Sequence, residues 1–150
     1  MSPNSVGLPV LIVMIEDDEG HATLIERNVR RAGVNNLIVP FTSGHAAMDF
    51  LLGEDGTGGV NGGKSLLILL DLNLPDMTGI EILAALKSND NTRRAPVIVL
   101  TTTDDAGEIS KCYDRGANVY ITKPLNYDSF AHAIRQLGLF LSVIQVPEIE

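Results

Sequence analysis

Short runs of aliphatic residues alternate with longer stretches of helical periodicity along most of the chain. The aliphatic runs occupy residues 10–15, 37–40, 66–70, 97–100 and 119–121. Three of them are almost wholly apolar, which is typical of strands buried on both faces of a parallel sheet. The pattern therefore predicts five strands, several of them in the interior of the sheet.

The stretches between and after these runs have the periodicity of amphipathic helices. We expect helices at residues 19–32, 43–52, 79–87, 104–115 and 128–141. Ser43 is a candidate N-cap, and acidic residues open the fourth helix, where the helix dipole favours them. Five strands alternating with five helices predict an α/β fold, a single doubly wound domain with a five-stranded parallel sheet.

Polar residues follow four of the predicted strands, where doubly wound sheets bind their ligands. These residues are Glu16, Asp17 and Asp18 after the first strand, Asp71 after the third, Thr101 after the fourth and Lys123 after the fifth. The sequence therefore predicts a functional site at the carboxyl edge of the sheet.

Glu16, Asp17 and Asp71 would bring three carboxylates into one crevice. Their mutual repulsion is costly unless a cation lies among them, and carboxylate oxygens with water suit Mg²⁺. Lys123 would add a positive charge, so the site could stabilise a phosphoryl group carried on a carboxylate. For residues 16–18 taken alone, an acidic helix N-terminus is the alternative interpretation.

Composition and charge narrow the class of protein further. The chain has 150 residues, about the size of one domain, and a formal net charge of -8, which disfavours binding to nucleic acid. Cys112 is the single cysteine, so no internal disulfide can form. The first aliphatic run is far shorter than the about 20 residues of a membrane span, and the N-terminus lacks the basic residues of a signal peptide. We expect a cytoplasmic protein that binds neither nucleic acid nor membrane.

Four motifs occur in order along the chain: residues 12–18 (IVMIEDD), 69–79 (LLDLNLPDMTG), 96–102 (PVIVLTT) and 116–124 (GANVYITKP). Together they resemble the receiver domain of response regulators in two-component systems, over about residues 9–137. The resemblance implies the flavodoxin-like (βα)5 receiver fold. It also implies that Asp71 accepts a phosphoryl group from the phosphohistidine of a sensor histidine kinase.

The resemblance also implies a Mg²⁺ site. Asp17 and Asp71 would be direct ligands, the backbone carbonyl of Asn73 a further ligand, and Glu16 would act through water. Asp18 lies one place beyond the usual acidic pair, and we interpret it as a helix cap.

Further residues have roles in phosphoryl binding and switching by the same resemblance. Thr101 and Lys123 would each bind a phosphoryl oxygen, and Thr102 would leave access to Asp71. Tyr120 occupies the place of the family's rotating aromatic residue, although an ordinary core tyrosine is the alternative. The Lys123–Pro124 peptide resembles the family's cis bond.

The sequence outside these motifs divides into a tail at 1–8, the receiver at 9–137 and an apolar extension at 138–150. The extension and the long glycine-rich segment 53–64 are similar to those of response regulators paired with bacterial and cyanobacterial phytochromes. This similarity implies a phytochrome histidine kinase as phosphodonor and a homodimer. The expected dimer contacts are Leu137, Phe140, Leu141, Val143 and Ile144. Packing of the extension on its own domain is the alternative.

The resemblance indicates a signalling switch rather than an enzyme: a single-domain regulator that changes its partner or its self-association. A phosphate shuttle or sink in a phosphorelay is an alternative. So is a Mg²⁺-dependent phosphatase of the aspartyl-phosphate type, although that class usually has a second aspartate where this chain has Asn73. A flavin mononucleotide carrier is disfavoured because the acids after the first strand would repel its phosphate.

Overall fold

The computed structural model describes residues 10–31, 33–53, 66–90, 92–101, 105–117 and 119–122. Within these ranges, strands and helices alternate as the sequence predicts. In chain order they are β1 (Leu11–Ile15), α1 (Glu19–Arg31), β2 (Ile38–Phe41), α2 (Gly44–Leu52), β3 (Leu66–Asp71), α3 (Gly79–Ser88), β4 (Val97–Thr101), α4 (Ala106–Asp114) and β5 (Val119–Thr122). The α/β prediction is therefore confirmed for this part of the chain, and the fifth helix, expected at 128–141, lies outside it.

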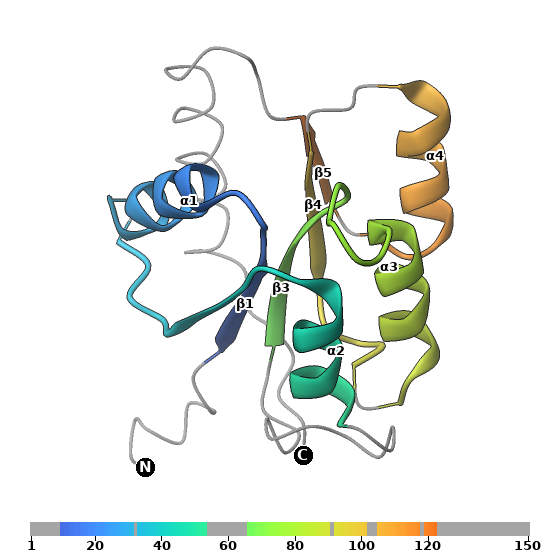
Figure 1. Cartoon of the computed structure of the whole chain (residues 1–150), viewed down its shortest axis with the longest axis horizontal. Helices are drawn as coiled ribbons and strands as arrows, with labels where there is room; N and C mark the ends of the chain where they lie inside the picture. The colour runs from blue at the N-terminus through green and yellow to red at the C-terminus, as the bar shows by residue number, and fades with distance from the viewer. Residues whose placement is uncertain are drawn as a thin grey trace.

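The strands form one parallel sheet in the order β2-β1-β3-β4-β5. Helix α1 covers one face of the sheet, and α2, α3 and α4 cover the other, as Figure 1 shows. This order makes β1 and β3 neighbours, and it places the turns after both strands at the same edge. The sheet is thus doubly wound, and the change in strand order lies beside the predicted site.

The hydrophobic core lies in two layers, one on each face of the sheet. Alternate residues of β1 enter different layers: Val13 and Ile15 pack toward one face, and Ile12 and Met14 pack in the other. Every residue of β3 is buried. Burial on both faces explains why β3 shows no alternation of polar and apolar residues.

Helix boundaries follow the capping residues. Ser43 is the N-cap of α2, as predicted, and its hydroxyl accepts the N–H of Ala46 at 3.2 Å. Asp105 is the N-cap of α4, so that helix begins two residues later than the expected start at 104. Cys112 is fully buried, which fits a packing role. No helix among the described residues is long and apolar enough to cross a bilayer.

Candidate metal and phosphoryl-acceptor site

Three carboxylates meet at the carboxyl edge of the sheet. Oxygens of Glu16, Asp17 and Asp71 all lie within 4.8 Å of one another. Glu16 is 3% exposed and Asp71 is 5% exposed, whereas Asp17 faces solvent. The expected convergence of these residues is confirmed. Because the donors are all oxygen and two of the acids are buried, the cluster fits a hard divalent cation such as Mg²⁺.

The register of two strands brings the buried acids together. Strand β1 pairs in parallel with β3, with Ile15 opposite Leu70, so the next residues, Glu16 and Asp71, come side by side. The backbone N–H of Glu16 donates to the carbonyl of Phe41 at 2.9 Å, which ties the end of β1 to β2. The central strands therefore fix the two carboxylates before any ion binds.

Backbone amides beside the cluster orient its carboxylates. Asp71 Oδ1 accepts the N–H of Asn73 at 3.2 Å, and Glu16 Oε2 accepts the N–H of Asp18 at 3.2 Å. Both bonds come from residues two positions further along the chain. The turns after β1 and β3 thus hold the acids in place.

Asp18 has a different role from its two acidic neighbours. Its Oδ1 accepts the N–H of His21 at 2.9 Å, and its carbonyl accepts the N–H of Ala22, so it caps α1. The capping interpretation is confirmed. The acidic triplet is therefore divided: Asp18 closes the helix, and Glu16 and Asp17 join Asp71.

The turn after Asp71 is a closed hairpin. Asn73 and Thr78 form an antiparallel bridge, and the N–H of Gly79 donates to the carbonyl of Leu72 at 3.0 Å. We call residues 72–78 the acceptor hairpin. It carries Asn73, whose N–H donates to Asp71 Oδ1 and whose carbonyl would be a metal ligand by the family resemblance.

Asp76, in the acceptor hairpin, is a site residue that sequence reasoning missed. Its carboxylate accepts the N–H groups of Gly44 and His45 at 2.8 and 2.9 Å. These two hydrogen bonds lower the pKa of Asp76 to about 2, and the bond from the His45 N–H has the larger effect. The His45 ring also contacts the same carboxylate, while the ring itself is largely exposed. No spacing in the sequence marks the pair, because the partners are 31 and 32 residues apart.

The remaining predicted site residues lie on β4 and β5 or beyond. Thr101 ends β4 and pairs with Thr122 of β5, so its backbone stands at the same edge as Asp71. Tyr120 is partly buried against the core, and its N–H donates to the Tyr113 hydroxyl at 3.2 Å. Thr102, Lys123, Pro124 and the expected dimer contacts (Leu137, Phe140, Leu141, Val143 and Ile144) lie outside the described residues.

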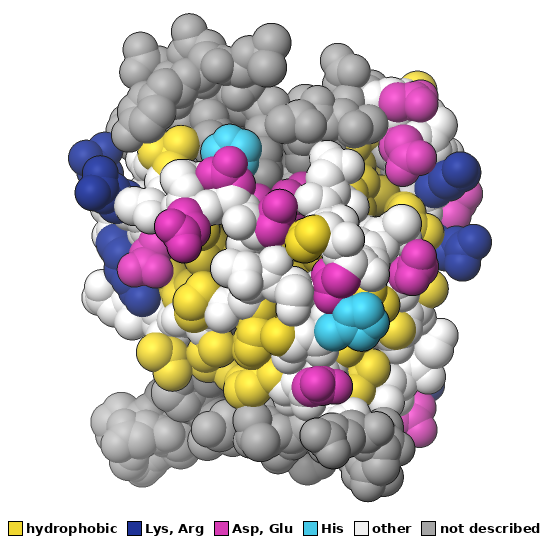
Figure 2. Space-filling view, viewed as in Figure 1, with side chains coloured by type: hydrophobic (Ala, Val, Ile, Leu, Met, Phe, Trp, Pro, Cys, Tyr) yellow, Lys and Arg dark blue, Asp and Glu magenta, His cyan; other side chains and the backbone are white. Residues whose placement is uncertain are grey.

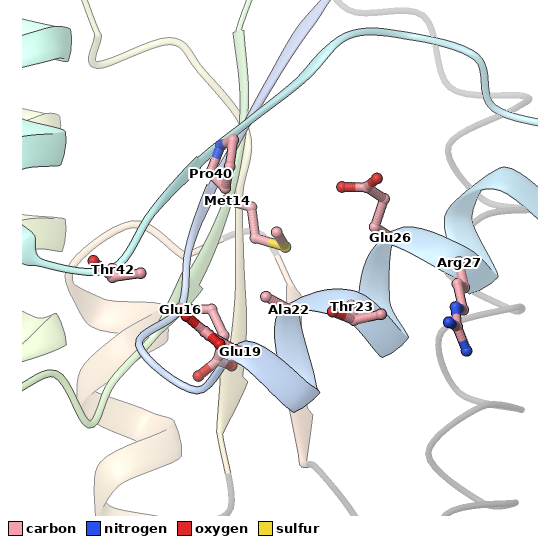
Figure 3. Close-up of a pocket in the computed structure, with 9 residues that line it drawn as sticks. All are labelled: Met14, Glu16, Glu19, Ala22, Thr23, Glu26, Arg27, Pro40 and Thr42. Carbon is pink, nitrogen blue, oxygen red and sulfur yellow. The ribbon is translucent and has the colours of Figure 1, made fainter.

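A cavity of about 440 Å³ adjoins the acidic cluster between α1 and the first two strands. Glu16 and Glu19 line the cavity near the start of α1, and Arg27 lies at its far end (Figure 3). On the surface, Asp and Glu side chains are spread over the middle and the sides of the face in Figure 2, whereas the Lys and Arg side chains drawn there lie only at its two sides. The surroundings of the cluster therefore favour a cation and its water.

Residues 12–135 match the family described as "Response regulator receiver domain". A receiver domain from Rhodospirillum rubrum is 66% identical, with a TM-score of 0.89 over 93% of this chain and 99% of that chain. The response regulator Rcp1 from Synechocystis sp. is 31% identical over 93% of this chain and 94% of its own length. The phosphorylated cyanobacterial phytochrome response regulator RcpA is 33% identical, with a TM-score of 0.80 over 92% of this chain and 98% of that chain.

The family match spans most of the chain, and the described part has the doubly wound parallel sheet and the acidic cluster that the sequence predicted. The chain belongs to the response regulator receiver domain family, and phytochrome response regulators are among the proteins it is similar to.

Proposed function

We propose that this protein is a phosphoacceptor switch in which Asp71 takes a phosphoryl group from a sensor histidine kinase, in a site that holds Mg²⁺. The observation that carries the proposal is the convergence of Glu16, Asp17 and Asp71 at the ends of β1 and β3. In this arrangement the buried Asp71 carboxylate can accept the phosphoryl group, and the two neighbouring acids can help to hold a divalent ion beside it. The similarity to RcpA, whose name identifies it as a phytochrome response regulator, supports a phytochrome as the kinase.

The chemistry assigned to Asp71 is displacement at phosphorus. A carboxylate oxygen of Asp71 attacks in line, a P–O bond forms, and the P–N bond to the kinase histidine breaks. The electron pair returns to the imidazole. The N–H of Asn73 holds Asp71 Oδ1 and so restricts the direction of attack. Asp71, Asp17, Glu16 through water and the Asn73 carbonyl would hold Mg²⁺, which neutralises charge on the transferred group when bound.

Thr101 and Lys123 complete the proposal for the phosphoryl group. Each would donate to one phosphoryl oxygen, and Thr102 would leave room for the group to enter. Thr101 lies on the strand next to β3. Tyr120 lies on β5, the strand next to β4. Its ring would turn when the Thr101 hydroxyl moves toward the phosphoryl group. Through these movements, the new charge at Asp71 would alter the conformation of the β4–β5 surface.

Phosphotransfer from candidate kinases tests the proposal. With radiolabelled phosphohistidine kinase and Mg²⁺, we expect up to one labelled phosphoryl group per chain, and excess chelator should prevent the labelling. The same protein should not turn over a phosphate ester. Sustained release of phosphate from an ester would instead support the alternative hypothesis of an aspartyl-phosphate-type phosphatase. Labelling that is undiminished by chelator would contradict the metal-dependent mechanism.

Asp17 and Asp18 form a matched pair of neighbouring acids for testing the metal site. Asp17→Asn removes a proposed direct ligand, so we expect Mg²⁺ to bind about tenfold more weakly or worse, equivalent to ~1.4 kcal/mol. Asp18→Asn keeps a good N-cap residue on α1 and should leave Mg²⁺ affinity almost unchanged. Titration calorimetry of both variants measures this. Equal affinities for the two would show that the ligand register is wrong.

We further propose that the end of the last predicted helix and the apolar extension join two copies of the chain. The contacts would be those named above, Leu137, Phe140, Leu141, Val143 and Ile144, because apolar positions there exceed what one amphipathic helix needs to cover its own sheet. Light scattering should find a dimer for the intact chain and a monomer for a chain truncated after Gln136. If both are monomers at tens of micromolar, the extension does not form a dimer.

A further inference from the structure

The acceptor hairpin is held at its base by its own bonds. The Asn73–Thr78 bridge and the Gly79-to-Leu72 hydrogen bond close it at the end nearest Asp71. Thr78 also caps α3, since its hydroxyl accepts the N–H of Glu81 at 3.1 Å. These contacts join the hairpin to β3 and α3, the elements on either side of it in the chain.

The other end of the hairpin is held by a different helix. Asp76 Oδ1 accepts the N–H of Gly44, and Oδ2 accepts the N–H of His45, so both carboxylate oxygens are bonded to the first turn of α2. Met77 packs against the same turn: a Cβ added at Gly44 would lie 3.0 Å from Met77 Sδ. The hairpin therefore fits closely against the N-terminus of α2.

The N-terminus of α2 shares its amides between two capping groups. Ser43 accepts the N–H of Ala46 within the helix, while Asp76 takes the two preceding amides from outside it. The same amides hold the pKa of Asp76 far below neutrality, so the carboxylate stays ionised and the contact persists at physiological pH. The N-terminus of α2 thus has two caps: Ser43, which acts only within the helix, and Asp76, which also anchors the acceptor hairpin.

We propose that Asp76 is a positioning residue, which clamps the acceptor hairpin to α2 and thereby fixes the Asn73 carbonyl relative to the Asp71 carboxylate. The inference rests on the proposed Mg²⁺ and phosphoryl site at Asp71. Ligands bind a metal more tightly when the protein has already ordered them, because binding then costs less conformational entropy. Releasing the clamp leaves the hairpin held by the bonds at its base and by the packing of Met77, without hydrogen bonds to α2. Mg²⁺ affinity then falls while the ligands themselves are unchanged.

Three variants test the clamp. Asp76→Ala removes both bonds to α2, and Asp76→Asn keeps one acceptor oxygen. Ser43→Ala is the matched control, because it removes a cap from the same helix end without touching the hairpin. We expect Mg²⁺ to bind about tenfold more weakly to Asp76→Ala, the range found for groups that orient metal ligands, with Asp76→Asn intermediate. Ser43→Ala should bind Mg²⁺ within about twofold of wild type, although it loses helix stability.

A measurement on the metal-free protein separates positioning from simple stability. The amide hydrogens of Asn73 and Gly79, which donate to Asp71 Oδ1 and to the Leu72 carbonyl, should exchange faster in Asp76→Ala than in wild type, and should be unchanged in Ser43→Ala. Equal Mg²⁺ affinity in Asp76→Ala and wild type would overturn the clamp, as would an equal loss in Ser43→Ala. Wild-type protein that binds no Mg²⁺ would instead show that the proposed function has failed, and the clamp with it.

Discussion

Asp71→Asn is expected to take up no phosphoryl label and to lose most of the stabilisation that Mg²⁺ gives the wild type. The amide is isosteric with the carboxylate but cannot attack phosphorus as an anion, so acceptance at this residue should fall below detection. In metal-free protein the substitution removes one of three clustered charges, two of them buried, and should raise the melting temperature.

With Mg²⁺ present, we expect the wild type to have the higher melting temperature instead. At 100 times its dissociation constant, Mg²⁺ stabilises the wild type by about 2.7 kcal/mol, whereas Asp71→Asn has lost a ligand and gains little. Thermal denaturation with and without Mg²⁺ measures both effects. Asp90→Asn is the control, because it replaces an aspartate that is 91% exposed. Label retained in Asp71→Asn would move the acceptor to another residue, and identical Mg²⁺ shifts in the two variants would remove Asp71 from the metal site.

The strands could be predicted to within about one residue, for a physical reason. Residues 66–70 are Leu-Leu-Ile-Leu-Leu, and a run of that kind is stable in a parallel sheet only with both faces covered. Asp71 ends the same strand, so its place at the carboxyl edge followed from the sequence. The meeting of Glu16 with Asp71 followed in turn from the neighbouring positions of β1 and β3.

The helices were less well defined by the sequence. Asp104 and Asp105 are both good N-cap residues, so only the structure shows that Asp105 caps α4. In α3, Ile82, Leu83 and Leu86 are buried, whereas Ile80 is only partly buried. This helix is apolar on most sides, so its periodicity does not single out one face.

The contacts that shape the acceptor hairpin could not be predicted from the sequence. Asp76 lies in a Pro-Asp-Met turn, where an aspartate commonly bonds its own backbone, and its bonds to α2 depend on how the hairpin folds back. The role of Gly79 could not be predicted from the sequence either. The sequence shows a glycine at the start of a helix, whereas the structure shows a close approach of two backbone segments.

Gly79→Ala is expected to destabilise the protein by about 3 kcal/mol, at the upper end of the usual cost of overpacking. A Cβ at this position would lie 2.5 Å from both Cα and Cδ2 of Leu72 and 3.1 Å from the carbonyl oxygen of Asp71. The Leu72 backbone cannot easily move away, because its carbonyl accepts the N–H of Gly79 itself. For a domain of this size the melting temperature should fall by roughly 10 °C.

Gly107→Ala is the matched control, since Gly107 also lies in the first turn of a helix. The nearest atom to a Cβ there is Asp105 Oδ1 at 3.4 Å, an ordinary contact. Alanine should therefore be neutral or stabilise α4 by up to about 1 kcal/mol. Any shift of Leu72 also displaces the adjoining Asp71, so Gly79→Ala should bind Mg²⁺ more weakly even where it is fully folded, and Gly107→Ala should not. Similar melting temperatures and Mg²⁺ affinities for the two variants would mean that the close approach of Gly79 to Leu72 does not constrain the acceptor site.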